Sequence, residues 1–328
     1  MQSRDFFHFF RPLYVLLAGA LGGGVLTILF SPYFPVPCKN NAVAFFCVPE
    51  FSVMFFIMGI LWSLMAISLS PGWGIFSWLL KRHIERKDTR FRSRVLIRLI
   101  VLVMIIAVIS YVIFKSLGQF NPEAQTRWNM GVPEGVQRIL LIHSIYFLVA
   151  ILPYLLGMFL LSALIREIGV CIHEIDIDNS EADLAVQFIN PLLLYRRLLQ
   201  LFLLVSGIML SMFPLVYMVV RSIIITIDPP MGNLYPASYV IFQGLIFSML
   251  LLFIYVPAFL ELTVVGRHLR EVLCPLNSLS NLRETVEKRK ILDNLLQTEG
   301  SFVTNLGSSI LTLSPLISSF LILLGVKV

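Results

Sequence analysis

Charged residues are scarce in this chain, and their absence from long stretches is its most informative feature. Asp, Glu, Lys and Arg make up 13% of the 328 residues, against about 25% in ordinary soluble domains. A helix needs about 20 apolar residues to cross a bilayer core. The pattern therefore excludes a compact water-soluble domain and predicts an all-α integral membrane protein. The long stretches without any charged residue are 12–38, 51–80, 99–114, 139–165, 198–220, 229–260 and 300–326.

Catalytic signatures are missing as well. The sequence has no G-x-S-x-G, H-E-x-x-H or P-loop run, and its five histidines are scattered. None of its four cysteines forms a C-x-x-C pair, so no zinc or redox motif is indicated. We therefore expect no enzyme activity, no cofactor and no metal site. Cys38 and Cys47 fall in one predicted outer loop, where a disulfide and two free thiols are the open alternatives.

The runs without charge predict a polytopic helical bundle with six to seven transmembrane helices. The second span is expected to end at Ser70-Pro71-Gly72, because proline interrupts the helical hydrogen bonds, which leaves Trp73–Leu80 in the interface. We expect a six-span bundle over 1–263, a cytoplasmic amphipathic helix in 264–300 and an apolar segment in 301–328, either a seventh span or re-entrant. The other predicted spans are about 13–31, 95–114, 139–163, 198–220 and 238–262.

The distribution of basic residues predicts the orientation. With the N-terminus inside, 19 Lys and Arg fall on the inner side of the membrane and 6 on the outer side. Short loops rich in Lys and Arg remain in the cytoplasm. We therefore predict a multi-pass protein of the cytoplasmic (inner or plasma) membrane, with a cytoplasmic N-terminus.

One inner loop is strongly basic. Eight Lys and Arg lie between Lys81 and Arg98, with Glu85 and Asp88 as the only acids. The charge can simply keep the loop inside, contact anionic lipid headgroups, or bind an anionic ligand through its phosphates. No glycine-rich phosphate loop accompanies the cluster, and nucleic acid is not an expected partner. The candidates for lipid or ligand contact are Lys81, Arg82, Arg86, Lys87, Arg90, Arg92 and Arg94.

The last apolar run carries small polar residues on one helical face. They recur at spacings of four and three residues, and an apolar face that includes Ile310, Leu313 and Ile317 lies opposite. Such a face suits the lining of a pore built from several subunits, tight packing between helices, or a re-entrant hairpin turning at Ser314-Pro315. The pore-lining candidates are Ser301, Asn305, Ser308, Thr312 and Ser319.

Residues 276–300 predict an amphipathic helix that could bind a partner helix, a second subunit or the membrane surface. Few ionisable residues fall at membrane depth. His143 lies near the outer end of the fourth span and Glu261 near the inner end of the sixth. Glu261 is the best candidate for a functional charge, and a salt bridge to Arg267 or Arg270 is the simpler expectation.

Two functions remain open at this point. The first is a homo-oligomeric channel for small ions, gated from the cytoplasmic side and lined by the polar face of the last run. The alternative is a membrane scaffold or assembly factor that conducts nothing and recruits a cytoplasmic protein partner through 164–197 and 264–300.

Overall fold

The computed structural model describes residues 49–84, 134–173, 186–227, 229–234, 237–275, 282–296 and 306–325. Every regular element in these ranges is an α-helix. The predicted spans at 13–31 and 95–114 lie outside them. The helices are α3 (Pro49–Ile84), α6 (Glu134–His173), α8 (Ile189–Ile227), α9 (Met231–Leu234), α10 (Ser238–Leu273), α11 (Leu282–Leu296) and α12 (Leu306–Gly325).

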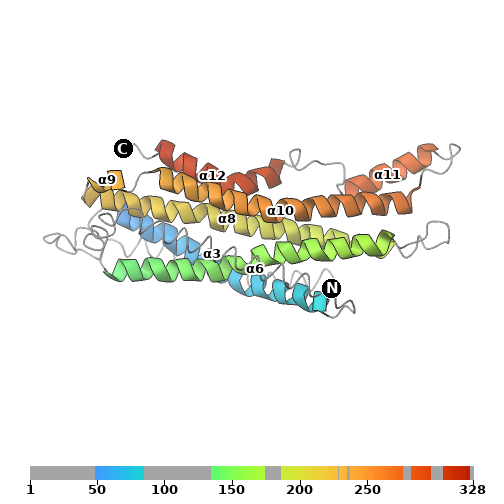
Figure 1. The fold of residues 1–328 in the computed structure, drawn as a ribbon, viewed down its shortest axis with the longest axis horizontal. Helices are drawn as coiled ribbons and strands as arrows, with labels where there is room; N and C mark the ends of the chain where they lie inside the picture. Colours follow the sequence, from blue (N-terminus) through green and yellow to red (C-terminus); the bar gives the residue numbers. More distant parts are fainter. Residues whose placement is uncertain are drawn as a thin grey trace.

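Four of the described helices, α3, α6, α8 and α10, are long and apolar enough to cross a membrane. They contain 36, 40, 39 and 36 residues. At 1.5 Å per residue these helices are about 54–60 Å long, whereas a bilayer core is about 30 Å thick. They run along the longest axis of the molecule (Figure 1). Each helix therefore continues well past the thickness of the hydrocarbon core.

The directions of the helices follow from their side-chain contacts. The ring of Phe147 on α6 lies 6.5 Å from that of Phe247 on α10, and Ser162 on α6 contacts Glu261 on α10, so these two helices are parallel. On α8, Phe213 packs on Phe247 at 5.6 Å, whereas Leu192 lies beside Leu262, so α8 runs the opposite way. The apolar core lies between these three helices and α3.

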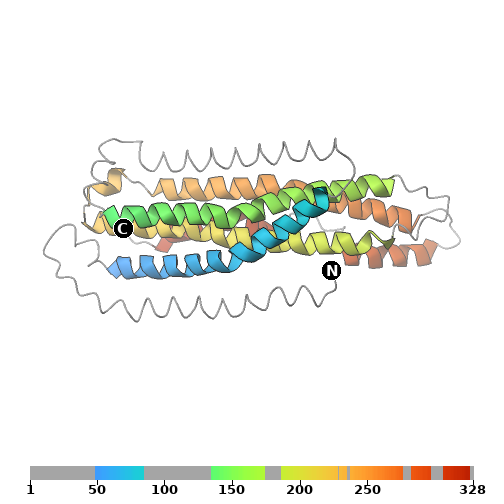
Figure 2. The same cartoon turned by 90° about the horizontal axis from the view of Figure 1, so that it is seen from below.

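α3 is one continuous helix, and the predicted break at Ser70-Pro71-Gly72 is wrong. Figure 2 shows that α3 changes direction near its middle instead of ending there. The bend is held against α6, because the hydroxyl of Tyr154 donates to the carbonyl oxygen of Ser68 at 2.5 Å. Gly72 lies directly against the Tyr154 ring. A membrane helix tolerates proline where a neighbouring helix satisfies the distorted backbone, as here.

α12 packs along α8 and α10, as seen in Figure 1. It continues through Ser314-Pro315, so the re-entrant turn predicted as one alternative at that position is absent. Proline distorts the helix there, and the backbone N–H of Leu316 donates to the hydroxyl of Ser248 on α10 at 3.1 Å. The α12 helix is therefore fixed to its neighbours at the point where its own hydrogen bonding is weakest.

Candidate functional site at the charged end of the bundle

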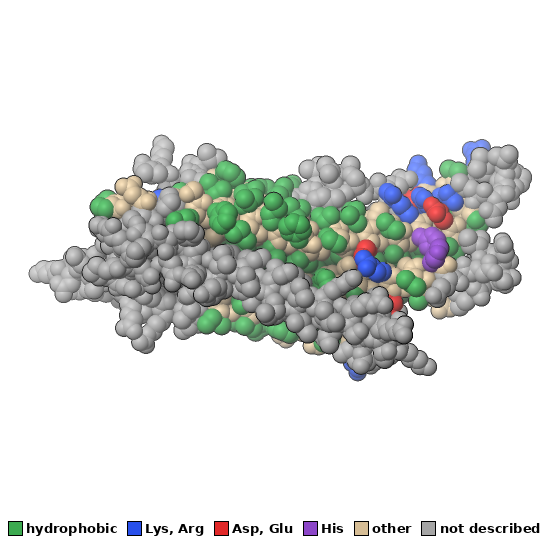
Figure 3. All heavy atoms as spheres, in the orientation of Figure 1, with side chains coloured by type: hydrophobic (Ala, Val, Ile, Leu, Met, Phe, Trp, Pro, Cys, Tyr) green, Lys and Arg blue, Asp and Glu red, His purple; other side chains and the backbone are tan. Residues whose placement is uncertain are grey.

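Charged side chains gather at the end of the bundle where α6 and α10 finish and α8 begins. Figure 3 shows hydrophobic surface along much of the molecule and Lys, Arg, Asp, Glu and His together toward this end. We call it the charged end. Of the described residues it comprises 81–83, 162–173, 189–197, 261–275 and 282–296.

A carboxylate on α10 joins α6 at the start of the charged end. Glu261 accepts a hydrogen bond from the Ser162 hydroxyl at 2.5 Å and another from Nε of Arg166 at 2.9 Å. The sequence predicted Arg267 or Arg270 as its partner, and that prediction is wrong. Arg166 is 95 residues away in the chain, so only the packing of α6 beside α10 brings it to Glu261. The contact indicates a structural ion pair between helices.

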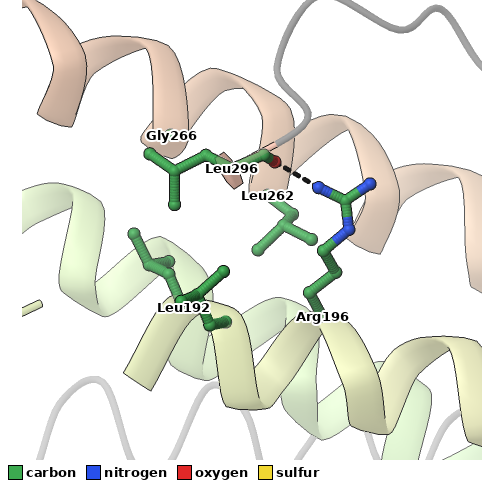
Figure 4. Close-up of a pocket in the computed structure, with 6 residues that line it drawn as sticks. Leu192, Arg196, Leu262, Gly266 and Leu296 are labelled. Atoms are coloured by element: carbon green, nitrogen blue, oxygen red, sulfur yellow. Dashed lines mark hydrogen bonds between the residues drawn. The ribbon is translucent and has the colours of Figure 1, made fainter. Parts of the chain in front are cut away.

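The amphipathic helix is held at this end by polar contacts. Its Asp293, only 4% exposed, accepts from Arg270 on α10 at 2.8 and 3.0 Å. Arg289 donates from Nε to the carbonyl oxygen of Cys274 at 2.8 Å. Arg196 on α8 donates to the carbonyl oxygen of Leu296, the last residue of α11 (Figure 4). These contacts orient α11 against α8 and α10. The helix is shorter than the predicted 264–300 segment, because α10 itself continues to Leu273.

A small hollow lies beside the Arg196 contact. Figure 4 shows apolar side chains from α8, α10 and α11 around it. Its empty volume is no more than ≈ 200 Å³, which is below the range of about 300–1,000 Å³ typical of small-molecule sites. The hollow is therefore a packing feature under α11. Its lining residues are Leu192, Leu193, Arg196, Leu262, Gly266 and Leu296.

The outward side of α11 carries exposed apolar residues. Ile291 and Leu295 are 65% and 47% exposed. Val286 is 51% exposed as well, but it precedes the buried Asp293 by seven residues, or about two turns, and therefore lies on the opposite side of the helix from Leu295. The ion pair between Glu284 and Lys288 lies on the same helix at 2.7 Å, and both of its side chains are exposed. Polar groups and the buried Leu296 therefore attach α11 to the bundle, while Ile291 and Leu295 face away from it.

The contacts at the charged end place five helices at one level of the bundle axis. Glu261 on α10 contacts Arg166 on α6, and Arg196 on α8 contacts Leu296 on α11. Tyr195, the residue before Arg196 on α8, contacts Arg82 on α3. From this level, α8 continues for about 35 Å through the uncharged residues 198–220. That length matches a bilayer core of about 30 Å. The first charges of the charged end thus lie where a hydrocarbon core would finish.

Of the basic-loop candidates, only Lys81 and Arg82 are described. Lys81 is exposed, and Arg82 is partly buried against two aromatic rings. Their contact with lipid or ligand stays a prediction. Arg86, Lys87, Arg90, Arg92 and Arg94 lie outside the described residues.

The described side chains of the predicted pore-lining stripe lie inside the chain. Thr312 and Ser319 are both 0% exposed, whereas Ile310, Leu313 and Ile317 on the opposite face of α12 are exposed. Ser301 and Asn305 lie outside the described ranges, and of Ser308 only the backbone is described. In this arrangement the polar face packs tightly against neighbouring helices, which is one of the alternatives that the sequence left open. A pore lined by the stripe stays a prediction.

Hydroxyl groups next to the stripe show how α12 packs. Ser211 on α8 donates to the hydroxyl of Ser314 at 2.8 Å, and Ser318 donates to the carbonyl oxygen of Ser211 at 3.1 Å. Because Gly207 lies beside Leu311 and Ser211 beside Ser314, α12 is parallel to α8. A pore lined by this face of α12 would therefore require the helix to separate from α8 and α10.

The remaining candidates from the sequence are distant from the charged end or are not described. His143 lies 1% exposed inside the bundle, where its Nδ1 accepts from Nε1 of Trp62 at 2.6 Å and its ring stacks on Phe213 at 5.9 Å. Cys38 and Cys47 lie outside the described residues. The two other cysteines, Cys171 and Cys274, belong to the charged end and are free thiols. The sequence did not point to Arg196 or Asp293, because nothing local marks contacts with residues 100 and 23 positions away in the chain.

No protein-family model matches this chain, and neither the curated proteins nor the solved structures contain a match. The functional assignment therefore rests on the geometry of its own residues.

Proposed function

We propose that the chain is a multi-pass scaffold of the cytoplasmic membrane that presents α11 to a cytoplasmic protein partner. The observation that carries this proposal is the attachment of α11. Arg270 and Arg196 hold it to the bundle through polar contacts, and Ile291 and Leu295 remain exposed on its outer side. An amphipathic helix with exposed apolar residues fits an apolar groove of a partner.

The exposed side chains of α11 offer a modest binding energy. Full burial of a Val, Leu or Ile side chain stabilises by about 1.5–3 kcal/mol. Because Ile291 and Leu295 are about half exposed or more, a groove would gain about 1 kcal/mol from each. A total of about 2 kcal/mol favours a regulated partner over a permanent subunit, with the remaining affinity supplied by contacts around the helix.

The proposal includes the orientation of the chain in the membrane. The excess of Lys and Arg on one side, 19 against 6, favours a cytoplasmic location for the charged end. The four long helices would then anchor α11 at a fixed distance from the membrane. A scaffold needs such rigid attachment, because a partner must meet α11 in one orientation.

A photo-crosslinking experiment in cells tests this function. A photo-reactive amino acid replaces Ile291 on the outer side of α11, and in a control chain it replaces Ile317, which is also exposed but lies on α12. We expect position 291 to form an adduct with one cytoplasmic protein, which position 317 does not form. The additional substitution Leu295→Ser should reduce the adduct, because it removes part of the docking surface.

Two results would contradict the scaffold. The first is an adduct at position 291 that contains only lipid or a second copy of this chain. The second is steady ion flux through liposomes that contain the purified chain alone, because a scaffold needs no conducting path.

A further inference from the structure

Two aromatic rings from two helices hold Arg82 in place. Its guanidinium carbon lies 5.4 Å from the centre of the Trp78 ring, one turn earlier on α3, and 5.6 Å from that of Tyr195 on α8. A cation within about 6 Å of a ring centre is attracted by the electrons of the ring. Tyr195 is fully buried, so its position is set by the core. The packing of α3 against α8 therefore positions this guanidinium.

The contacts of Arg82 differ from those of several other arginines at the charged end. Arg166, Arg270 and Arg289 each donate to a carboxylate or carbonyl oxygen. Within the described part of the chain, Arg82 contacts the two rings and no oxygen acceptor. A guanidinium has five N–H donors, and aromatic rings provide no strong acceptor for them. Its hydrogen-bonding capacity is therefore available to a ligand that carries oxygen atoms and negative charge.

The depth of Arg82 indicates where that ligand comes from. The residue follows the uncharged stretch 51–80 by two positions, and Tyr195 precedes the uncharged stretch 198–220 by three. Arg82 thus lies at the level where charges begin, which in a bilayer is the level of the lipid headgroups. Lys81 beside it is exposed and adds a second positive charge.

We propose that Arg82 binds the phosphate of an anionic phospholipid headgroup in the leaflet at the charged end. Guanidinium binds phosphate through two parallel N–H···O bonds, and its plane also stacks on aromatic rings, so one group can make both contacts. Trp78 and Tyr195 act as positioning residues. The site would fix the depth of α3 in the membrane, and it is independent of any protein partner at α11.

The test is a lipid titration of the full chain in delipidated detergent micelles. Phosphatidylglycerol, phosphatidylcholine and inorganic phosphate are added separately, and bound lipid is counted by native mass spectrometry. We expect wild type to retain phosphatidylglycerol in preference to phosphatidylcholine. Arg82→Gln should weaken phosphatidylglycerol binding about tenfold, because it removes a charged hydrogen-bonding pair. Arg82→Lys should also weaken it, because lysine lacks the planar fork.

Arg283→Gln is the matched control, because it removes the same charge from an exposed position on α11. It should leave phosphatidylglycerol binding unchanged. Trp78→Phe, which keeps a ring beneath the guanidinium, should bind better than Trp78→Leu. Equal binding of the two lipids by wild type would overturn the proposal even if the Arg82 variants fail to fold. Equal losses in Arg82→Gln and Arg283→Gln would also overturn it. Displacement of the bound lipid by inorganic phosphate at millimolar concentration would also overturn the proposal, because the ligand of Arg82 would then be a free anion.

Discussion

Enlarging Gly244 should separate α12 from α10. A Cβ atom added at Gly244 would lie 2.5 Å from the carbonyl oxygen of Pro315, a backbone atom that no rotamer change can move. Real Cβ contacts are essentially never shorter than 3.0 Å. The side chain of Ser319 occupies the same space, where its hydroxyl donates to Pro315 at 2.7 Å. Any residue larger than glycine must therefore displace α12 by roughly 0.5 Å or more.

The expected cost follows from two opposing terms. Overpacking a tight contact costs about 1–3 kcal/mol, whereas replacing glycine by alanine in a helix stabilises by about 0.5–1 kcal/mol. Gly244→Ala should therefore destabilise the protein by about 1 kcal/mol. Gly244→Val adds two methyl groups without further helix propensity and should cost about 2–3 kcal/mol.

Thermal unfolding in detergent measures this effect. Both variants should melt below wild type, with Gly244→Val the lower of the two. Gly232→Ala is the control, because the nearest atom to its added Cβ is Cδ1 of Ile225 at 3.7 Å, an ordinary contact. The reasoning is refuted if Gly244→Val melts with wild type, or if Gly232→Ala lowers the melting temperature as much.

Two further predictions concern α11. Asp293→Asn should weaken the attachment to Arg270 by about 1.5–3 kcal/mol and speed tryptic cleavage within α11, because it removes the charge from a buried hydrogen-bonded pair. Glu284→Gln should leave that rate near wild type. Lys288 lowers the pKa of Glu284, but water screens this exposed ion pair, so its loss should cost little. Equal cleavage rates in Asp293→Asn and Glu284→Gln would contradict the role given to the buried Asp293 contact. The double substitution Ile291→Ser and Leu295→Ser should keep the wild-type melting temperature while reducing partner capture, because both side chains are exposed; a marked drop in melting temperature would show that they pack within the chain.

Hydropathy and periodicity anticipated part of this fold. The predicted spans at 139–163, 198–220 and 238–262 fall within α6, α8 and α10. The polar and apolar faces predicted for the last run separate in α12, since Thr312 is buried and Ile317 is exposed. These features depend on local sequence, because burial against neighbouring helices or lipid follows the helical period.

Features that depend on distant residues were missed. Pro71 was expected to end a helix, but Tyr154 supports the backbone there from another helix. The Arg166 partner of Glu261 and the attachment of α11 through Arg196 likewise join residues about 100 positions apart. Periodicity predicted which faces are polar, but not which neighbour each face contacts, because that depends on how whole helices pack.

The most direct test of the account is the sidedness of the two ends of the bundle. Two variants of a chain without its native cysteines carry one cysteine each, Lys290→Cys at the charged end and Asn233→Cys beyond α8 at the opposite end, both exposed positions. A membrane-impermeant thiol reagent should label Asn233→Cys in intact cells and Lys290→Cys only after permeabilisation. Labelling of Lys290→Cys in intact cells would place α11 outside, out of reach of any cytoplasmic partner, and would contradict the account.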